Sequence, residues 1–263
     1  MQAAVWSSPD AIFLLNASPD IRFQIEANSE LRPCPKRGSR NTPIQGIVLT
    51  TADLDQVLGL LLLREFQPLT VYATALVRRV LEANSLFRML ARVPNQLSWV
   101  EIKAGVSFVL GTSDIVCTPF AMAGELPFYA TELGPSEPGH ACLGLILEAG
   151  GKRIAYTPAV PAITDPLRTI YAACETIFVD GTFWSDEELS GTHAGMPTAQ
   201  AIGHLPMSGK DGTIALLSDT PAMQKVFVHL NNTNPVLDPR SGAYNAVVEA
   251  GWKIGQDGWE LGR

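Results

Sequence analysis

The sequence predicts an α/β layered domain. Short apolar runs typical of strands alternate along the chain with segments whose apolar residues recur at i, i+3 and i+4, as on one face of a helix. The chain has 263 residues, of which 46% are hydrophobic, so it is long enough to bury one substantial core. We therefore expect one domain over residues 1–263.

The elements follow from these runs. The predicted strands are the apolar segments 11–16, 44–50, 97–103, 106–110, 114–120, 142–148, 152–157, 176–180 and 225–230. The predicted helices cover residues 54–65, 74–92, 166–174, 213–218 and 239–250. Two segments rich in Gly with Pro, Ser, Thr or Glu, 121–141 and 185–212, are expected to be long loops, which in compact domains often carry function.

Charge and composition exclude several classes of protein. The net charge is −7 and no block of Lys or Arg is present, which argues against nucleic acid or an acidic membrane surface as a partner. No apolar run approaches the roughly 18–20 residues that span a bilayer. The four cysteines are far apart and form no C-x-x-C pair, which favours reduced buried thiols in a cytoplasmic protein over disulfides.

Polar side chains collect where apolar runs end. Loops at the carboxyl ends of strands commonly carry sites in α/β sheets. The residues in question are Asn16, Asp20, Asp53, Asp55, Asp180, His229, Asn231, Asn232 and Asn234. Each also has an ordinary structural interpretation, because Asp and Asn form turns and cap helices. Their spacing alone leaves a metal site and a set of turns and caps about equally supported.

The remaining histidines are less informative. His204 follows a short helical segment beside Gly203, where a backbone could approach a ligand, and it equally suits a helix C-terminus. His140 and His193 lie in predicted loops and have no motif that indicates a role.

Five motifs together resemble the PQQ-biosynthesis protein B family of the metallo-β-lactamase superfamily. They are "NASPDIR" (16–22), "TTADLDQVLGLLLLRE" (50–65), "VDGTFW" (179–184), "GHLPMSG" (203–209) and "HLNNTNPVLD" (229–238). The resemblance implies an αββα sandwich with a metal site at one edge of two facing sheets. The chain begins well inside the family pattern, so we expect it to lack the usual first strand, and a homodimer could cover the resulting sheet edge.

The resemblance also implies a ligand set. The superfamily signature H-x-H-x-D-H aligns on Thr51, Asp53, Asp55 and Gln56. The family keeps the final Asp-His pair, but Gln56 stands here in place of that histidine. Asp55, Asp180 and His229 are then the expected metal ligands. His204 matches a histidine that supports the metal or transfers protons.

This ligand set predicts a weakened metal site. Two carboxylates and an imidazole approach the sets that leave positions open on iron(II), whereas the amide oxygen of Gln56 is a weak ligand. His204 could complete the ligand set; otherwise oxygen-rich ligation by Asp53, Asp55, Asp180 and Gln56 favours Mn²⁺ or Mg²⁺. We expect one divalent metal, iron(II) above zinc or manganese, in a site weak enough to stand empty.

Two functions follow from the resemblance. The first is metal- and oxygen-dependent hydroxylation of a tyrosine-derived PQQ precursor, with His204 or Asp53 moving protons. The second is non-catalytic binding or transport of PQQ or its precursor; an ordinary metallo-hydrolase is a weaker third. The candidates for substrate contact are Asn16, Asp20, Asn232 and Asn234.

Overall fold

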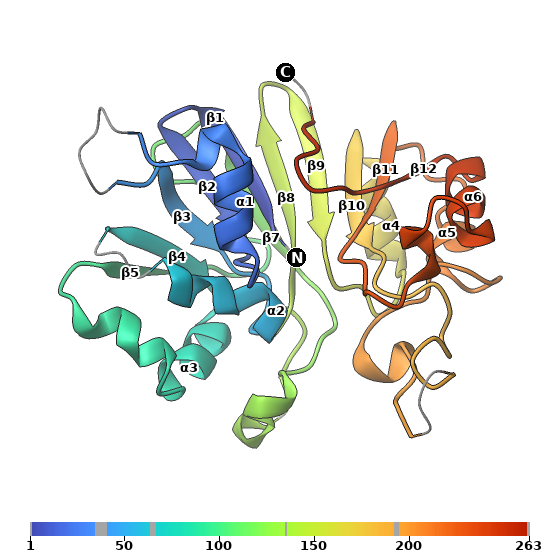
Figure 1. Ribbon diagram of the computed structural model, residues 1–263, viewed down its shortest axis with the longest axis horizontal. Helices are drawn as coiled ribbons and strands as arrows, with labels where there is room; N and C mark the ends of the chain where they lie inside the picture. Colours follow the sequence, from blue (N-terminus) through green and yellow to red (C-terminus); the bar gives the residue numbers. More distant parts are fainter. Residues whose placement is uncertain (1, 35–40, 64–66, 135, 192–194, 262–263) are drawn as a thin grey trace. The chain divides into compact units, whose positions relative to one another are not determined.

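The computed structural model describes residues 2–34, 41–63, 67–134, 136–191 and 195–261. Its elements are shown in Figure 1. His193 lies outside the described residues.

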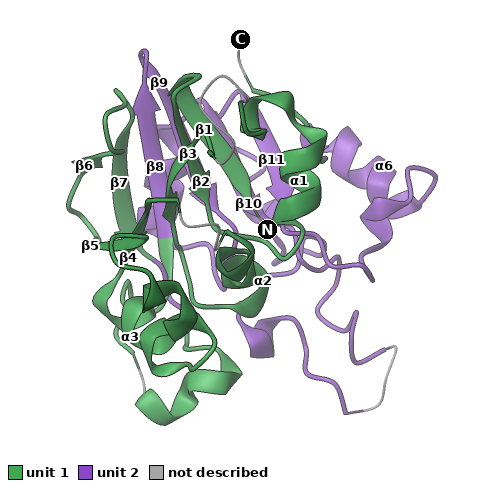
Figure 2. Ribbon diagram, turned by 60° about the vertical axis from the view of Figure 1, so that its left-hand side comes forward, with its two compact units in different colours: residues 1–121, 125–143, 257–263 green, residues 122–124, 144–256 purple. Residues whose placement is uncertain are grey.

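The chain divides into two compact units, coloured green and purple in Figure 2. Unit 1 comprises residues 1–121, 125–143 and 257–263. Unit 2 comprises residues 122–124 and 144–256. The single domain expected from the sequence stays a prediction.

Unit 1 is built on a five-stranded sheet. Its strands, in spatial order, are β1 (Ala3–Ser8), β2 (Ala11–Leu15), β3 (Ile44–Val48), β4 (Leu69–Ala73) and β5 (Leu97–Glu101). β1 is antiparallel to β2, and the other neighbours are parallel. All five residues of β2 are buried, as expected for an inner strand that is covered on both faces of the sheet. Unit 1 also contains the antiparallel strands β6 (Phe108–Val109) and β7 (Val116–Ala121).

Short helices cover the unit 1 sheet. They are α1 (Ile21–Ala27), η1 (Ser29–Leu31), α2 (Leu54–Val57), η3 (Leu58–Leu62), α3 (Ala75–Ala83), η4 (Phe87–Arg92) and η5 (Phe128–Leu133). In α3 the Thr74 hydroxyl caps the first turn by accepting from the Val77 N–H, and one face of the helix enters the core.

Unit 2 carries the second sheet. Its strands are β12 (Trp252–Ile254), β11 (Gln224–Val228), β10 (Thr176–Asp180), β9 (Lys152–Thr157) and β8 (Leu143–Ala149), in that spatial order. β8 and β9 form an antiparallel hairpin, and β9 to β12 are parallel. The hairpin turns through Gly150 and Gly151, whose positive φ angles of 56° and 77° suit a tight two-residue turn. The helices are α4 (Asp165–Ala172), η6 (Gln200–Ile202), α5 (Thr213–Leu216), η7 (Pro235–Leu237) and α6 (Gly242–Glu249).

Most sequence-predicted elements are found, with two kinds of difference. The helix predicted over 74–92 breaks at Asn84, whose side chain accepts the Leu86 N–H and so competes with the helical bond. The helix predicted over 54–65 changes to 3₁₀ geometry at Leu58, and residues 64–65 lie outside the described part. The strands β1, β4 and β12, the helix α1 and the 3₁₀ segments η1, η5 and η7 were not predicted.

Two further expectations concern the cysteines and membrane-spanning helices. All four cysteines are free thiols, and Cys117, Cys142 and Cys174 are buried, as predicted. Burial raises the pKa of Cys117 to about 12, which keeps this thiol protonated and unreactive. Within the described residues, no helix combines the length and the apolar character that crossing a bilayer requires.

Candidate metal centre

The carboxyl ends of two parallel strands bring Asp180 and His229 together in unit 2. Asp180 is the last residue of β10 and pairs in register with Val228, the last residue of β11. His229 follows directly. Gly181 permits this approach, because a Cβ at that position would lie 2.9 Å from the Cβ of Phe227. The "VDG" motif therefore fixes the spacing of the two side chains.

His229 has an unusual backbone conformation. Its φ is +61°, in the left-handed region that side chains other than Gly seldom adopt. Such a conformation costs free energy and persists only where the surrounding structure imposes it. The imidazole is thereby turned toward Asp180, with 3.7 Å between Nδ1 and Oδ1.

A loop after η6 supplies the third side chain, His204. The Leu205 N–H donates to the Val160 carbonyl, which holds this loop against the segment that follows β9. His204 Nδ1 then lies 2.6 Å from Asp180 Oδ2. The rings of His204 and His229 are 5.4 Å apart between centroids, and Phe183 packs edge-on against His204.

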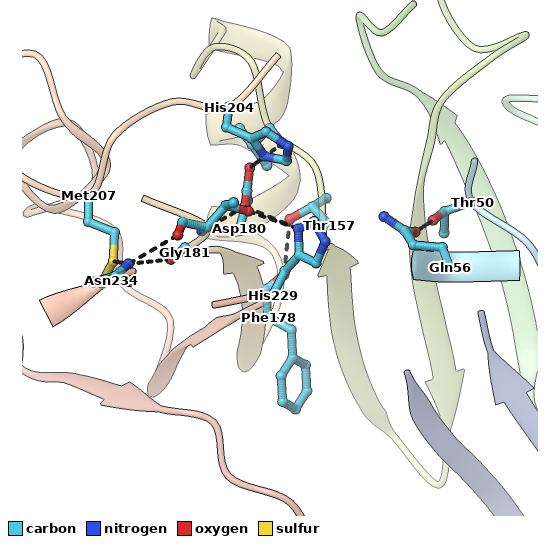
Figure 3. Close-up of polar contacts among 12 residues, drawn as sticks. Thr50, Gln56, Thr157, Phe178, Asp180, Gly181, His204, Met207, His229 and Asn234 are labelled. Carbon is cyan, nitrogen blue, oxygen red and sulfur yellow. Dashed lines mark hydrogen bonds and ion pairs between the residues drawn. The ribbon is translucent and has the colours of Figure 1, made fainter. Parts of the chain in front are cut away.

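The Asp180 carboxylate is buried and fully hydrogen-bonded (Figure 3). Oδ2 accepts from the Val160 N–H at 3.0 Å as well as from His204. Oδ1 accepts from the N–H of Thr182 at 3.0 Å and from its hydroxyl at 2.5 Å. Four donors therefore satisfy both oxygens and fix the plane of the carboxylate.

Burial alone would raise the pKa of Asp180, but the electrostatic interactions and hydrogen bonds with His204 and His229 outweigh it. The pKa of the carboxyl consequently lies well below its usual range. Asp180 is therefore ionised, and both of its oxygens accept hydrogen bonds from their neighbours.

These bonds determine which nitrogen of each imidazole carries hydrogen. His204 must donate from Nδ1, because its partner is a carboxylate that only accepts. The Thr182 hydroxyl donates its one proton to Asp180, so at 2.8 Å it accepts from His229 Nδ1. Both rings then direct the lone pair to Nε2, the nitrogen that neutral imidazole offers to a metal.

Asp180, His204 and His229, hereafter the histidine–aspartate cluster, can hold a metal ion. One donor atom from each lies within 4.8 Å of the other two. No other group of three or more His, Cys, Asp or Glu within the described ranges meets this condition. The structure brings together the predicted ligands Asp180 and His229 with His204, which the sequence analysis gave as a supporting or proton-transferring residue or as the residue that completes the ligand set.

Asn234 positions the loop after β11. Its buried Nδ2 donates to the carbonyl oxygens of Gly181 and Thr182, and its Oδ1 accepts from the Val236 N–H. Both amide atoms are thus engaged in fixing the backbone beside Asp180. Of the other predicted substrate contacts, Asp20 and Asn232 are exposed.

A second polar group, the amide cluster of Asn16, Thr50 and Gln56, lies in unit 1 at the ends of β2 and β3. Asn16, like His229, has a left-handed backbone, with φ of +64°. Its Oδ1 accepts the Thr50 N–H at 2.8 Å, and its Nδ2 donates to Gln56 Oε1 at 2.6 Å. Gly59 lets this segment approach β2, since a Cβ there would lie 2.4 Å from the Ser18 carbonyl oxygen.

Asp53 and Asp55 flank this amide cluster. Asp53 is the N-cap residue of α2 and Asp55 lies in its first turn, where acidic side chains are favourable. Both are partly exposed and both take part in polar or electrostatic interactions. Burial, and then the charge of Asp53, raise the pKa of Tyr129 to about 12. The membership of Asp55 in a metal site stays a prediction.

Sequence reasoning missed Thr182 and Thr50. Each buried hydroxyl joins two polar side chains of its cluster. Thr182 stands two residues after Asp180 in a quoted motif, and this closeness was the available signal. Thr50 begins another quoted motif, residues 50–65, directly after a predicted strand, and this position was its signal.

Comparisons with known proteins identify the family. The model of the Beta-lactamase superfamily domain matches residues 12–230. Coenzyme PQQ synthesis protein B of Methylobacterium sp. (strain 4-46) is 38% identical, over 99% of this chain and 87% of the relative. The same protein of Bradyrhizobium diazoefficiens is also 38% identical, with the same coverage.

Solved structures agree. The crystal structure of zinc-bound PqqB from Methylobacterium extorquens matches with a TM-score of 0.92 and 35% identity, covering 100% of this chain and 87% of that one. Unliganded yeast PDE1 matches at a TM-score of 0.64 with 12% identity, over 95% of this chain and 90% of that one, and indicates the fold alone. The predicted mixed α/β, metallo-β-lactamase fold is confirmed. The chain belongs to the coenzyme PQQ synthesis protein B family of the β-lactamase superfamily, and by homology it is a PQQ biosynthesis protein.

Proposed function

We propose that this protein is a metal-dependent oxygenase of PQQ biosynthesis that hydroxylates a tyrosine-derived precursor. The observation that carries the proposal is the histidine–aspartate cluster, which offers two imidazoles and one carboxylate within 4.8 Å. Two histidines and a carboxylate are the ligand set of many non-haem iron(II) oxygenases.

The donor set fits one divalent ion. His204 and His229 would hold it through Nε2, because their Nδ1 atoms are engaged with Asp180 and Thr182. When bound, iron(II) would supply the activation of oxygen that hydroxylation requires. Zinc is the alternative, since the related Methylobacterium extorquens structure is zinc-bound.

Asp180 has two roles to consider in this proposal, the orientation of the imidazoles and ligation of the ion. A carboxylate that accepts from a ligating histidine fixes the ring and makes its other nitrogen more basic. The carboxylate would ligate the ion only by exchanging one of its four hydrogen bonds.

His204 can serve in either of two ways. Its Nε2 either binds the ion or accepts a proton from the substrate, while Asp180 holds Nδ1–H in both cases. Asp53 is the alternative group for proton transfer. Among the polar residues proposed to contact the precursor, Asp20 and Asn232 are exposed, whereas Asn16 and Asn234 are buried and act by positioning neighbouring groups.

Metal analysis combined with a hydroxylation assay tests the proposal. The purified protein is loaded with iron(II) under anaerobic conditions, and the bound metal is counted. A tyrosine-containing precursor is then added with oxygen and a two-electron reductant, which is needed to reduce the second oxygen atom to water. We expect about one iron per chain and a product heavier by one oxygen atom. A folded protein that binds no metal and leaves the precursor unchanged would instead support a binding or carrier protein.

Histidine variants separate the roles. His229→Ala should lose both metal and hydroxylation. His204→Ala should lose metal if it is a ligand, and only hydroxylation if it moves a proton. His140→Ala is the matched control, because His140 is exposed in unit 1 and should change neither.

A further inference from the structure

Gln56 carries a buried hydrogen-bond donor without a partner. The residue is only 1% exposed, and its Nε2 has no hydrogen-bond partner among the described residues. Leaving a buried donor unpaired reduces the stability of a protein, so native proteins rarely do so without a bound molecule or water to complete the bond.

The orientation of this amide follows from its neighbours. The Thr50 N–H can only donate, so the Asn16 atom that receives it must be Oδ1. The other Asn16 amide atom is then Nδ2, a donor, and the Gln56 atom 2.6 Å away must be the oxygen. The Thr50 hydroxyl also lies 2.9 Å from this oxygen. Figure 3 shows the oxygen directed at Thr50 and the nitrogen on the opposite side of the amide.

This orientation excludes Gln56 as a metal ligand in the present arrangement. Its oxygen, the one atom able to ligate, is engaged in the amide cluster. An amide NH₂ has no lone pair for a metal and offers two N–H donors instead. Where the family pattern has a histidine, this chain therefore has an amide NH₂ group that can donate a hydrogen bond to an oxygen acceptor.

We propose that Gln56 Nε2 donates a hydrogen bond to a neutral carbonyl oxygen of a bound small molecule, such as a quinone carbonyl of PQQ or the matching carbonyl of its precursor. The charge nearby favours a carbonyl over a carboxylate, because Asp53 and Asp55 lie within three residues of Gln56. The carboxyl ends of the parallel strands β2 and β3, where the amide cluster lies, are a usual location for such a contact. The choice of PQQ or its precursor as the ligand rests on the proposed function.

The inference is tested by measuring the binding of PQQ, with calorimetry and with the visible absorbance of PQQ as two independent signals. Gln56→Glu keeps an oxygen for Asn16 and Thr50 and replaces only the NH₂ group with a second oxygen. Gln56→Met removes the donor without adding charge, although it also removes the oxygen that accepts from Asn16 and Thr50. We expect Kd for PQQ to rise about tenfold in Gln56→Met and further in Gln56→Glu.

A matched control and a direct readout accompany these variants. Gln45→Glu makes the same change on β3, where the side chain donates to the Asp10 carbonyl at an exposed position, and should leave Kd unchanged. In the wild type, the side-chain NH₂ resonances of ¹⁵N-labelled Gln56 should shift when PQQ is added. This measurement decides the matter even if the variants fail to fold.

Several outcomes would overturn the inference. Unchanged Kd in Gln56→Met, or unshifted Gln56 resonances while others move, would show that the NH₂ group does not contact PQQ. A wild type that does not bind PQQ would also overturn it, while the hydroxylation assay would still decide the proposed function. Conversely, Gln56-dependent binding without hydroxylation would leave this inference standing and remove the oxygenase proposal.

Discussion

The histidine–aspartate cluster of unit 2 and the amide cluster of unit 1 are built from similar parts. Each lies at the carboxyl ends of parallel strands, and each has a left-handed residue that follows a strand, His229 and Asn16. In each, a buried threonine links two polar side chains, Thr182 in one cluster and Thr50 in the other.

The two clusters nevertheless offer opposite chemistry. In unit 2 the central group, Asp180, only accepts, so the imidazoles around it donate from Nδ1 and direct lone pairs outward. In unit 1 the central oxygen belongs to Gln56, so the same amide directs an N–H donor outward. One cluster suits a cation and the other an oxygen acceptor. The two clusters thus differ in the group that they offer: imidazole lone pairs around a charged carboxylate in unit 2, and an N–H donor on a neutral amide in unit 1.

The largest effect is expected from Asp180→Ala. The substitution removes the acceptor for four donors and leaves the N–H groups of Val160 and Thr182 unpaired in a buried site, while the Thr182 hydroxyl keeps His229 Nδ1 as its partner. Breaking a buried, hydrogen-bonded charge typically costs about 3–5 kcal/mol. We expect a loss of this size in the free energy of unfolding, measured by urea denaturation of metal-free protein.

Asp211→Ala is the control for this prediction. Asp211 is exposed in the same unit, and its loss should change the free energy by less than about 0.5 kcal/mol. A loss near this smaller value for Asp180→Ala would mean that the carboxylate does not organise its cluster.

Gln56→His tests whether one residue accounts for the difference between the clusters. The change replaces the amide with an imidazole beside Asp55, as in the family pattern. Zinc or iron affinity should rise about 10–100-fold, or roughly 1.4–2.8 kcal/mol. Calorimetric titration measures the affinity, and the melting temperature in the presence of metal should rise with it.

His229→Ala in the Gln56→His background should abolish both gains. If the wild type already binds one equivalent of iron tightly and Gln56→His changes nothing, the amide is not a deficit. His204 would then be the residue that completes the ligand set.

Thr182→Val examines the support of His229. The valine keeps the shape of the side chain but removes the hydroxyl that accepts from His229 Nδ1 and donates to Asp180. Loss of such a partner typically weakens metal binding about 10–100-fold. Zinc titration measures this loss, and the ¹⁵N resonances of the His229 ring should show that Nδ1–H is no longer favoured. Thr182→Ser should restore both, and a valine variant with wild-type affinity would contradict the assignment.

Much of the fold was predictable because its signals are local. Buried strands such as β2 and β10 are continuous apolar runs, and α4 has a clear amphipathic pattern. The missed strand β12 is only three residues long, too short for periodicity to identify. The break of the helix predicted over 74–92 depends on a side-chain bond of Asn84 that the apolar pattern does not encode.

The sequence predicted the types of residue in the candidate site better than it predicted the hydrogen bonds between them. Asp180 and His229 follow strands and belong to recognisable motifs, so they were found. The orientation of the Gln56 amide was not, because it depends on Asn16, which is 40 residues earlier in the chain. The place of His204 likewise depends on a backbone bond between its loop and Val160. Such long-range contacts fix hydrogen-bond roles that neither spacing nor family pattern reveals.

The smallest effect is expected from Thr50→Val, the same substitution in the amide cluster. Thr50 Oγ1 lies 2.9 Å from Gln56 Oε1 and 3.1 Å from Asn16 Oδ1, and its one proton can serve only one of them at a time. Gln56 Oε1 keeps the Asn16 donor when the hydroxyl is lost, so no buried acceptor is stranded. The free energy of unfolding should fall by only about 1 kcal/mol, measured by urea denaturation, with Thr50→Ser restoring it. Zinc affinity should stay at the wild-type value, because the cluster orients a donor rather than a ligand. If Thr50→Val instead weakened zinc binding as much as Thr182→Val, the amide cluster would take part in holding the metal, and the contrast between the two clusters would fail.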